Sequence, residues 1–309
     1  MINRYLTFYT PSMQFVVFCA ILSMSWLVGG SLIELLNTKI TGLTTAQITN
    51  LTDISVAVAN QFKLINSLLL VVTLLLPAVL FAYLAYPEPM KYLGLRVDIK
   101  KQHWLWAIAL MIISMPFTSL LEQWSRLIPA IGQSKALDDN YNKLAQSMLQ
   151  GSSPIDLAIN IGAMCLLPAF IEEIFFRGCL QQLLLNWMKK TPFLAILAVA
   201  VIFSAFHGQL SGFVPRVFLG LLLGVAYHYS GSIWLTMCMH ALNNFVTVLM
   251  VYLFNAHIIK IDMTKLPDTN LWLGLGSALA VGGVLYLFYT NRKPFLLVEV
   301  DKTIEEPLP

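Results

Sequence analysis

Residues 67–86 read SLLLVVTLLLPAVLFAYLAY and contain no charged side chain. Because a helix needs about 20 predominantly apolar residues to cross a bilayer, this stretch predicts a transmembrane helix. The rest of the chain has the same character, since 58% of its 309 residues are hydrophobic and only 11% are charged. An ordinary soluble domain is about half apolar and about a quarter charged. We therefore predict an all-α fold, a polytopic membrane helical bundle.

Eight stretches are long and apolar enough to be candidate spans. They lie near residues 12–35, 62–86, 103–121, 155–186, 193–208, 213–229, 232–254 and 270–290. We interpret the first as a retained anchor, because it has no small-residue cleavage pattern and only Arg4 precedes it. No hydrophilic stretch is long enough for a second domain, so residues 1–309 are expected to form a single membrane domain.

The basic residues predict the orientation and some of the partners. Lys and Arg in short loops favour the cytoplasmic side of a membrane. A cytoplasmic N-terminus places these inside: Arg4, Lys91, Arg96, Lys100, Lys101, Lys189, Lys190, Arg292 and Lys293. Both termini are therefore predicted to be cytoplasmic. A net charge of +3 without long basic runs indicates the lipid bilayer as a partner and no nucleic acid. The short loops favour a bacterial inner membrane.

Two segments are predicted to lie outside the spans. Leu137, Tyr141, Leu144 and Met148 are spaced so that they form one apolar stripe on a helix, which is typical of a segment lying on the membrane surface. Residues 93–99 alternate between apolar and polar side chains, which predicts a short extended connector.

Three ionisable residues lie inside the span at 155–186, in the sequence FIEEIFFRG (170–178). A charged residue near the bilayer centre costs about 2.5 to 3.5 kcal/mol, so such residues usually pair and face the bundle interior. Glu173 and Arg177 are four positions apart with the acid first, which favours an ion pair within the helix. The helical period turns Glu172 about 100° away from Glu173. One acid can therefore be neutralised while Glu172 remains available.

Two histidines lie within other apolar spans. His207 follows Phe203 by one turn, and we expect the two rings to pack together. His240 precedes Asn244 by one turn on the same helix face. With Glu172 these residues form a set that can bind a borderline metal such as zinc or position a water.

The predicted depths of these residues in the membrane do not all agree. A turn between Lys189 and Lys190 places Glu172 level with His207. A count along straight helices leaves His240 on the order of 10 Å nearer the cytoplasm.

Simpler interpretations exist for each group. A single intramembrane histidine is more often an interhelical hydrogen-bonding group than a ligand. A pair such as Glu173 and Arg177 more often stabilises the structure than takes part in catalysis. Asn243 is expected to form a hydrogen bond between helices. Gly220 and Gly224 form a GxxxG pair, which is typical of close helix packing.

The charged and polar residues also form a set of motifs. EEIFFRG (172–178) matches EExxxR, FSAFH (203–207) matches FxxxH, and HALNN (240–244) matches HxxxN, in that order. In these motifs the chain resembles the CPBP family of intramembrane proteases, which includes type II CAAX prenyl endopeptidases and bacteriocin-processing or immunity proteins. The resemblance covers about residues 155–250 and implies a catalytic core of four helices there.

The resemblance also implies roles. It makes Glu172 the catalytic carboxylate and His207 its partner in activating water. His240 and Asn244 complete the site, either as further metal ligands or as donors to the oxyanion. Glu173 and Arg177 match the supporting part of the first motif. Members of the family are described both as metalloproteases, with a divalent metal that would here be zinc, and as glutamate-dependent proteases.

The predicted function is that of an intramembrane endopeptidase, metal-assisted, acting through a Glu/His-activated water. Its substrate would be a membrane-associated or prenylated-type peptide or protein. Two other classes stay open. A proton-coupled transporter could relay protons through Glu172, His207 and His240, and Pro168 offers one helix break for it, although no second half of the chain repeats that break. A non-catalytic immunity or scaffold protein would keep the fold only for binding.

Overall fold

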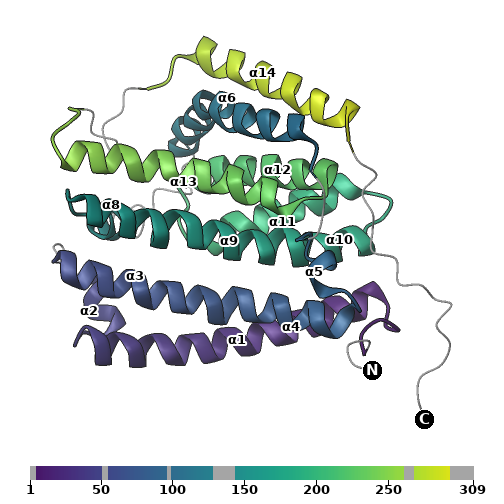
Figure 1. The fold of residues 1–309 in the computed structure, drawn as a ribbon, viewed down its shortest axis with the longest axis horizontal. Coiled ribbons are helices and arrows are strands. Elements are labelled where there is room, and N and C mark those ends of the chain that lie inside the picture. Colours follow the sequence, from purple (N-terminus) through teal and green to yellow (C-terminus); the bar gives the residue numbers. More distant parts are fainter. Residues whose placement is uncertain (1–4, 51–54, 96–98, 128–142, 261–267, 293–309) are drawn as a thin grey trace.

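The computed structural model describes residues 5–50, 55–95, 99–127, 143–260 and 268–292. All regular structure in these ranges is helical, and the helices form one bundle (Figure 1). Seven helices are long and apolar enough to cross a membrane: Pro11–Ile40, Val56–Ala85, Lys101–Arg126, Pro154–Trp187, Phe213–Ser230, Ile233–Asn255 and Leu271–Thr290. The prediction of an all-α polytopic bundle is confirmed.

The eighth predicted span, 193–208, is a shorter helix, α11 (Pro192–Phe206), with 15 residues. At about 1.5 Å per residue it is roughly 22 Å long, which is less than the ~30 Å of a bilayer's hydrocarbon core. The helix ends where Gly208 adopts a left-handed φ of +66°, ahead of the polar residues that follow it. Of the eight candidate spans, seven correspond in the described residues to helices long enough to cross a membrane, and the eighth is this shorter apolar helix.

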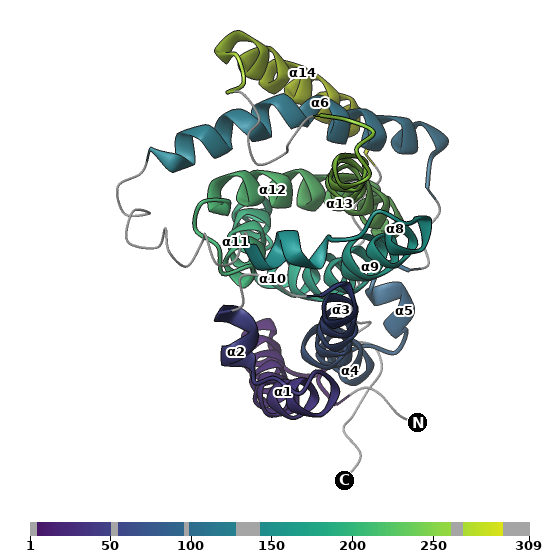
Figure 2. The same ribbon diagram turned by 90° about the vertical axis from the view of Figure 1, so that its left-hand side faces the viewer.

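The helices that carry the motifs lie in the middle of the bundle (Figures 1 and 2). These are α8 (Pro154–Asn160), α9 (Leu167–Glu173), α10 (Gln182–Trp187), α11, α12 (Phe213–Ser230) and α13 (Ile233–Asn255). On one side lie α1 (Pro11–Ile40), α2 (Thr45–Asn50), α3 (Val56–Leu70), α4 (Leu76–Ala85) and the short α5 (Pro89–Tyr92). On the other side lie α6 (Lys101–Arg126) and α14 (Leu271–Thr290).

Wide π-helical stretches allow two prolines inside long helices. One stretch, Ile161–Leu166, precedes α9 and Pro168, and another, Val71–Leu75, precedes α4 and Pro77. Proline lacks an N–H and clashes with the preceding turn of an α-helix, so a wider turn before it accommodates the ring. Pro154–Trp187 is consequently one continuous helix of 34 residues, with a third π-helical stretch at Ile174–Gln181. Pro168 does not break the helix.

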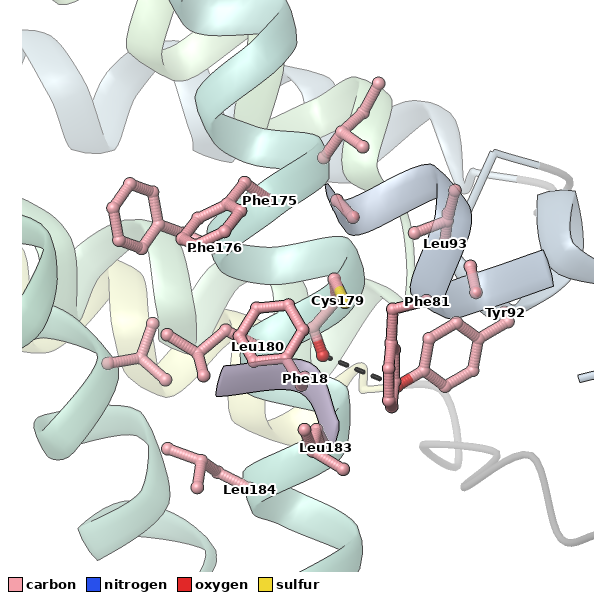
Figure 3. Close-up of a cluster of buried hydrophobic side chains, with 14 of the residues drawn as sticks. Phe18, Phe81, Tyr92, Leu93, Phe175, Phe176, Cys179, Leu180, Leu183 and Leu184 are labelled. Atoms are coloured by element: carbon pink, nitrogen blue, oxygen red, sulfur yellow. Dashed lines mark hydrogen bonds between the residues drawn. The ribbon is translucent and has the colours of Figure 1, made fainter. Parts of the chain in front are cut away.

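The middle layer packs on its neighbours through apolar clusters. The ring of Phe18 on α1 lies 5.3 Å from that of Phe81 on α4 and 5.6 Å from that of Phe175, measured between ring centres. Figure 3 shows these rings, and shows the Tyr92 hydroxyl donating to the Cys179 carbonyl at 3.4 Å. A second cluster joins α6, α12, α13 and α14. Both outer layers are thus held to the motif-bearing helices by burial of apolar surface.

The two glycines of the GxxxG pair lie where α12 contacts α11. A Cβ atom at Gly220 would lie 3.1 Å from Ala200, and one at Gly224 would lie 2.7 Å from Ile196 Cγ2. A methyl group in either position would require its neighbours to move, so the helices approach closely here. The predicted packing role of Gly220 and Gly224 is confirmed.

The described ends of the chain lie at one end of the bundle, on the right in Figure 1. Leu6 donates its N–H to the Leu84 carbonyl at 3.2 Å, near the end of α4. Lys100, just before α6, donates to the Asn291 carbonyl at 3.0 Å, just after α14. That this end is cytoplasmic stays a prediction.

The two predicted segments outside the spans are described only in part. Leu137 and Tyr141 lie outside the described residues, while Met148 is buried in a small apolar cluster that includes Ile48 and Phe62, with Leu144 packed against it. These two side chains therefore face protein. In the connector, residues 96–98 are not described, and Leu93 and Gly94 form a turn with a φ of +75° at Gly94. The connector therefore begins with a turn and is not extended there.

Candidate active site

The four predicted site residues come together. Glu172 lies near the end of α9, His207 directly follows α11, and His240 and Asn244 lie on α13. Their side chains line one cavity of about 410 Å³. Three helices thus contribute the carboxylate, the two imidazoles and the amide to a shared space inside the bundle.

Glu172 lines this space and carries an unpaired oxygen. Its side chain is 12% exposed, and its Oε2 atom lies 4.0 Å from Nε2 of His240. Among the described residues, no hydrogen-bond donor reaches Oε2. A buried carboxylate oxygen normally has a partner, so the unused hydrogen-bonding capacity of this atom marks it as a candidate for chemistry.

Glu173 is fully buried and joins two partners. Its Oε1 atom accepts a hydrogen bond from Nη1 of Arg177 at 2.7 Å, so the predicted ion pair is confirmed. The same oxygen lies 2.9 Å from Nδ1 of His240. A carboxylate bound to Arg177 can only accept, so Nδ1 of His240 carries the proton and its Nε2 is left for the cavity. Glu173 therefore fixes the orientation of the His240 ring.

Arg177 connects this pair to other parts of the site. It is fully buried, and its Nη2 donates to the Gly220 carbonyl at 3.2 Å. Its guanidinium carbon lies 4.7 Å from the centre of the Phe203 ring, within the range of a cation–π interaction. The arginine thus neutralises Glu173 and holds α9, α11 and α12 together.

His207 is held by Phe203 in two ways. Its Nδ1 atom lies 2.8 Å from the Phe203 carbonyl oxygen, which only accepts, so Nδ1 carries the proton. The two rings pack edge to face with centres 4.9 Å apart, which confirms the predicted contact. His207 therefore also keeps Nε2 available.

The Phe203 ring lies beside both imidazoles, since its centre is 5.8 Å from that of His240. The Phe203 ring thus packs against both imidazoles. The offset on the order of 10 Å that straight helices predict for His240 stays a prediction.

Asn244 and Asn243 lie side by side on the cavity wall. The Asn243 amide donates to Oδ1 of Asn244 at 3.3 Å. Both side chains line the cavity. This bond is between neighbours on α13, so the interhelical hydrogen bond predicted for Asn243 is not the one that forms.

Two cavity residues were missed from the sequence. Arg216, on the first turns of α12, donates through Nη1 to Oε1 of Gln209 at 2.8 Å and also bonds the Gln209 carbonyl. Both residues line the cavity beside His207. Arg216 stands near the end of a predicted span, where a basic residue is usually an interfacial anchor, and no motif singles it out.

The site has donors of the types that zinc takes. Glu172 offers a carboxylate oxygen, and both imidazoles offer Nε2 while Nδ1 is bonded to an oxygen, the usual arrangement of metal-binding histidines. However, no group of three or more His, Cys, Asp or Glu side chains in the described ranges is placed to hold a metal ion. The donor chemistry suits zinc, but the spacing of the donors does not enclose an ion.

A second cavity, of about 440 Å³, meets the first at the same residues. Glu172, His207 and Pro168 line both cavities. The second cavity extends along α3, where Lys63 and Asn66 contribute to its wall. Glu172 therefore borders both cavities.

Comparison with protein families matches residues 154–246 to the type II CAAX prenyl endopeptidase Rce1-like family. The matched segment contains all seven residues of the three motifs, and it confirms the resemblance over this part of the chain. It covers less than half of the sequence. Comparisons with curated proteins and with solved structures gave no match.

Proposed function

From the segment that matches the Rce1-like family, we propose that this protein is an intramembrane endopeptidase that hydrolyses a peptide bond of a membrane-associated peptide or protein. The observation that carries the proposal is the unpaired Oε2 atom of Glu172, which lies 4.0 Å from Nε2 of His240 in a cavity inside the bundle. Polar groups at membrane depth are tolerated where they line a water-filled cavity.

In the proposed reaction Glu172 acts as the general base. Its Oε2 accepts a proton from a water while the water oxygen attacks the carbonyl carbon of the scissile bond. The tetrahedral intermediate then collapses, the C–N bond breaks, and the proton passes from Glu172 to the leaving nitrogen. The products are a new carboxyl terminus and a new amine.

The oxyanion of the intermediate needs hydrogen-bond donors placed in advance. Asn244 offers its side-chain amide from the cavity wall. His240 offers an Nε2–H donor when its ring carries both protons, and an acceptor for the water when it carries one. Glu173 holds the ring in the same orientation in both states, because it bonds Nδ1.

Zinc assistance is a further part of this proposal. The donors are Oε2 of Glu172 and Nε2 of His207 and His240, with Asn244 beside them. Because their present spacing does not enclose an ion, zinc binding would require these side chains to draw together. A bound zinc would act as a Lewis acid on the substrate carbonyl or the water. The general-base route above uses only the chain's own residues and does not depend on it.

We also propose a bacterial inner membrane as its location. The competing transporter function loses the helix break that Pro168 offered it, because Pro168 lies in a continuous helix. The scaffold function predicts a cavity without chemistry, and it is separated from the protease by the following experiment.

The test uses randomised ten-residue peptides, one set carrying a farnesylated cysteine and one an N-terminal palmitoyl chain, incubated with the purified protein in lipid nanodiscs. Mass spectrometry identifies new termini. We expect cleavage by the wild type, reduced about a hundredfold or more in Glu172→Gln. His207→Ala and His240→Ala should also lose cleavage. Glu122→Gln, which changes an exposed carboxylate on α6, is the matched control. Cleavage by Glu172→Gln at the wild-type rate would exclude this mechanism.

A further inference from the structure

Lys63 is a buried cation inside a membrane-spanning helix. Its residue exposure is 2%, and it lies on α3 in the wall of the second cavity. Intramembrane lysines are costly, and they usually pair with an anion or mark a functional site. The partner of Lys63 is therefore the first question.

Within the described residues, Lys63 has no carboxylate partner. Its Nζ donates to the neutral Oδ1 of Asn60 at 2.9 Å, and it takes part in none of the ion pairs found there. Asp156 acts on it electrostatically, but the Asp156 carboxylate is engaged by Ser153, whose backbone N–H and hydroxyl donate to Oδ2 at 3.1 and 2.7 Å. An ammonium has three N–H donors, so Lys63 keeps donors for an anion.

The same cavity is also lined by Glu172 and His207. It therefore contains both the Lys63 ammonium and two residues of the proposed reaction centre. Lys63 and Glu172 form no ion pair although both line it. The rest of the wall is mainly apolar, with Trp26, Leu70 and Met164 among its residues. The cavity thus holds a positive charge that is not paired with the carboxylate of the proposed reaction centre.

The length of the cavity suits a short peptide. Its α3 side runs from Phe62 to Leu74, which at about 1.5 Å per residue is on the order of 18 Å. An extended chain advances roughly 3.3 Å per residue, so about five residues fit along it. Lys63 lies at the start of this side, and α9, which carries Glu172, contacts the Val71–Leu75 stretch at its end. A peptide whose scissile bond lies at Glu172 would therefore bring its far end to Lys63.

We propose that Lys63 is a specificity-determining residue that binds a carboxylate of the peptide substrate, about five residues from the bond that is cleaved. The carboxylate is either the free C-terminus or an Asp or Glu side chain, since both present the same anion to the ammonium. This inference rests on the proposed function, because it assigns the second cavity to the substrate.

The test compares matched peptide libraries in nanodiscs. One pair differs in a free or an amidated C-terminus, and the other pair differs in Asp and Glu or Asn and Gln at the positions around the fifth residue from the cleavage site. We expect the wild type to cleave the carboxylate member of one pair about tenfold faster, as a charge-assisted hydrogen bond would give. In Lys63→Met the ratio of the two rates should fall to about one.

Two further variants guard against misfolding. Lys63→Arg keeps the charge and should restore the preference. Lys39→Met removes an exposed cation of α1 that lines neither cavity, and it should retain the wild-type ratio. Each variant's unfolding temperature is measured in the same nanodiscs.

Binding of the same libraries to Glu172→Gln protein makes the result independent of catalysis. If cleavage fails in every library but the carboxylate peptides bind Lys63-dependently, the proposed function falls and the Lys63 site stands. Equal binding and cleavage of both members by the wild type, or an unchanged ratio in Lys63→Met, would overturn the proposal. So would a change confined to the phospholipids that copurify with Lys63→Met, which would make this a lipid-headgroup site.

Discussion

The carboxylate of Glu173 and the imidazole of His240 meet at 2.9 Å, although 67 positions separate them in the sequence. The contact joins α9 to α13 at the point where the first and third motifs lie. Because Glu173 is also bound to Arg177 at 2.7 Å, one carboxylate serves both a structural ion pair and the orientation of a site residue. Oε1 of Glu173 therefore links the stability of the bundle to the orientation of His240 in the proposed reaction.

We expect Glu173→Ala to lower both stability and cleavage. Removing the acid leaves Arg177 as an uncompensated buried charge, which costs about 3 to 5 kcal/mol, and it also frees the His240 ring. The measurement is the unfolding temperature in detergent micelles, followed by tryptophan fluorescence, together with cleavage of the peptide libraries.

The control for this prediction is the exposed pair Glu122–Arg126, which has the same spacing and the same N–O distance of 2.7 Å. Its side chains are 48% and 60% exposed, so Glu122→Ala should cost less than about 1 kcal/mol. Equal losses in the two variants would show that the burial of Glu173 does not set its energetic role.

Glu172→Gln should separate activity from stability. The Oε2 atom of Glu172 has no hydrogen-bond donor among the described residues, so neutralising the side chain removes a desolvated charge without breaking a bond. We expect an unfolding temperature at or above that of the wild type, while cleavage is lost. A marked decrease in the unfolding temperature would instead assign Glu172 a structural role.

Much of this arrangement follows from local rules. The separation of four residues predicts the Glu173–Arg177 pair and the His207–Phe203 packing, because both contacts lie within one helix or at its end. Apolar length predicts the seven spans. These features depend only on residues that are close together in the chain, so they can be predicted without knowing how the helices pack.

Other features depend on how helices cross. The bond from Glu173 to His240 joins two helices, so periodicity within either one gives no sign of it. The approach of α11 to α12 at Gly220 and Gly224 likewise depends on how the two helices pack. The second cavity and Lys63 need the packing of α3 against α9, and no motif includes them.

Gly224→Ala should loosen the packing of α12. A methyl group there would lie 2.7 Å from Ile196 Cγ2 and 3.0 Å from Oε1 of Gln181, so the helices must shift. Overpacking of this kind costs about 1 to 3 kcal/mol. Gly282 of α14 is the control, because no atom lies within 4 Å of its added Cβ. Gly282→Ala should be neutral or stabilising by up to about 1 kcal/mol in the same unfolding assay. A neutral Gly224→Ala would contradict the close approach of α12 to α11 and the π-helical stretch.

Treatment with a chelator tests whether the imidazoles of His207 and His240 bind a metal ion. If zinc assists the reaction, treatment with a strong chelator should abolish cleavage, added zinc should restore it, and elemental analysis should find about one equivalent per chain. His207→Ala and His240→Ala should both lose that equivalent, since each removes one Nε2 donor, while Glu173→Gln should weaken zinc affinity about 10- to 100-fold by freeing the His240 ring. If Glu172 acts without a metal, cleavage should persist in the chelator and still depend on Glu172. Zinc that remains bound in the double variant His207→Ala, His240→Ala would place the ion elsewhere and contradict its assignment to this cavity.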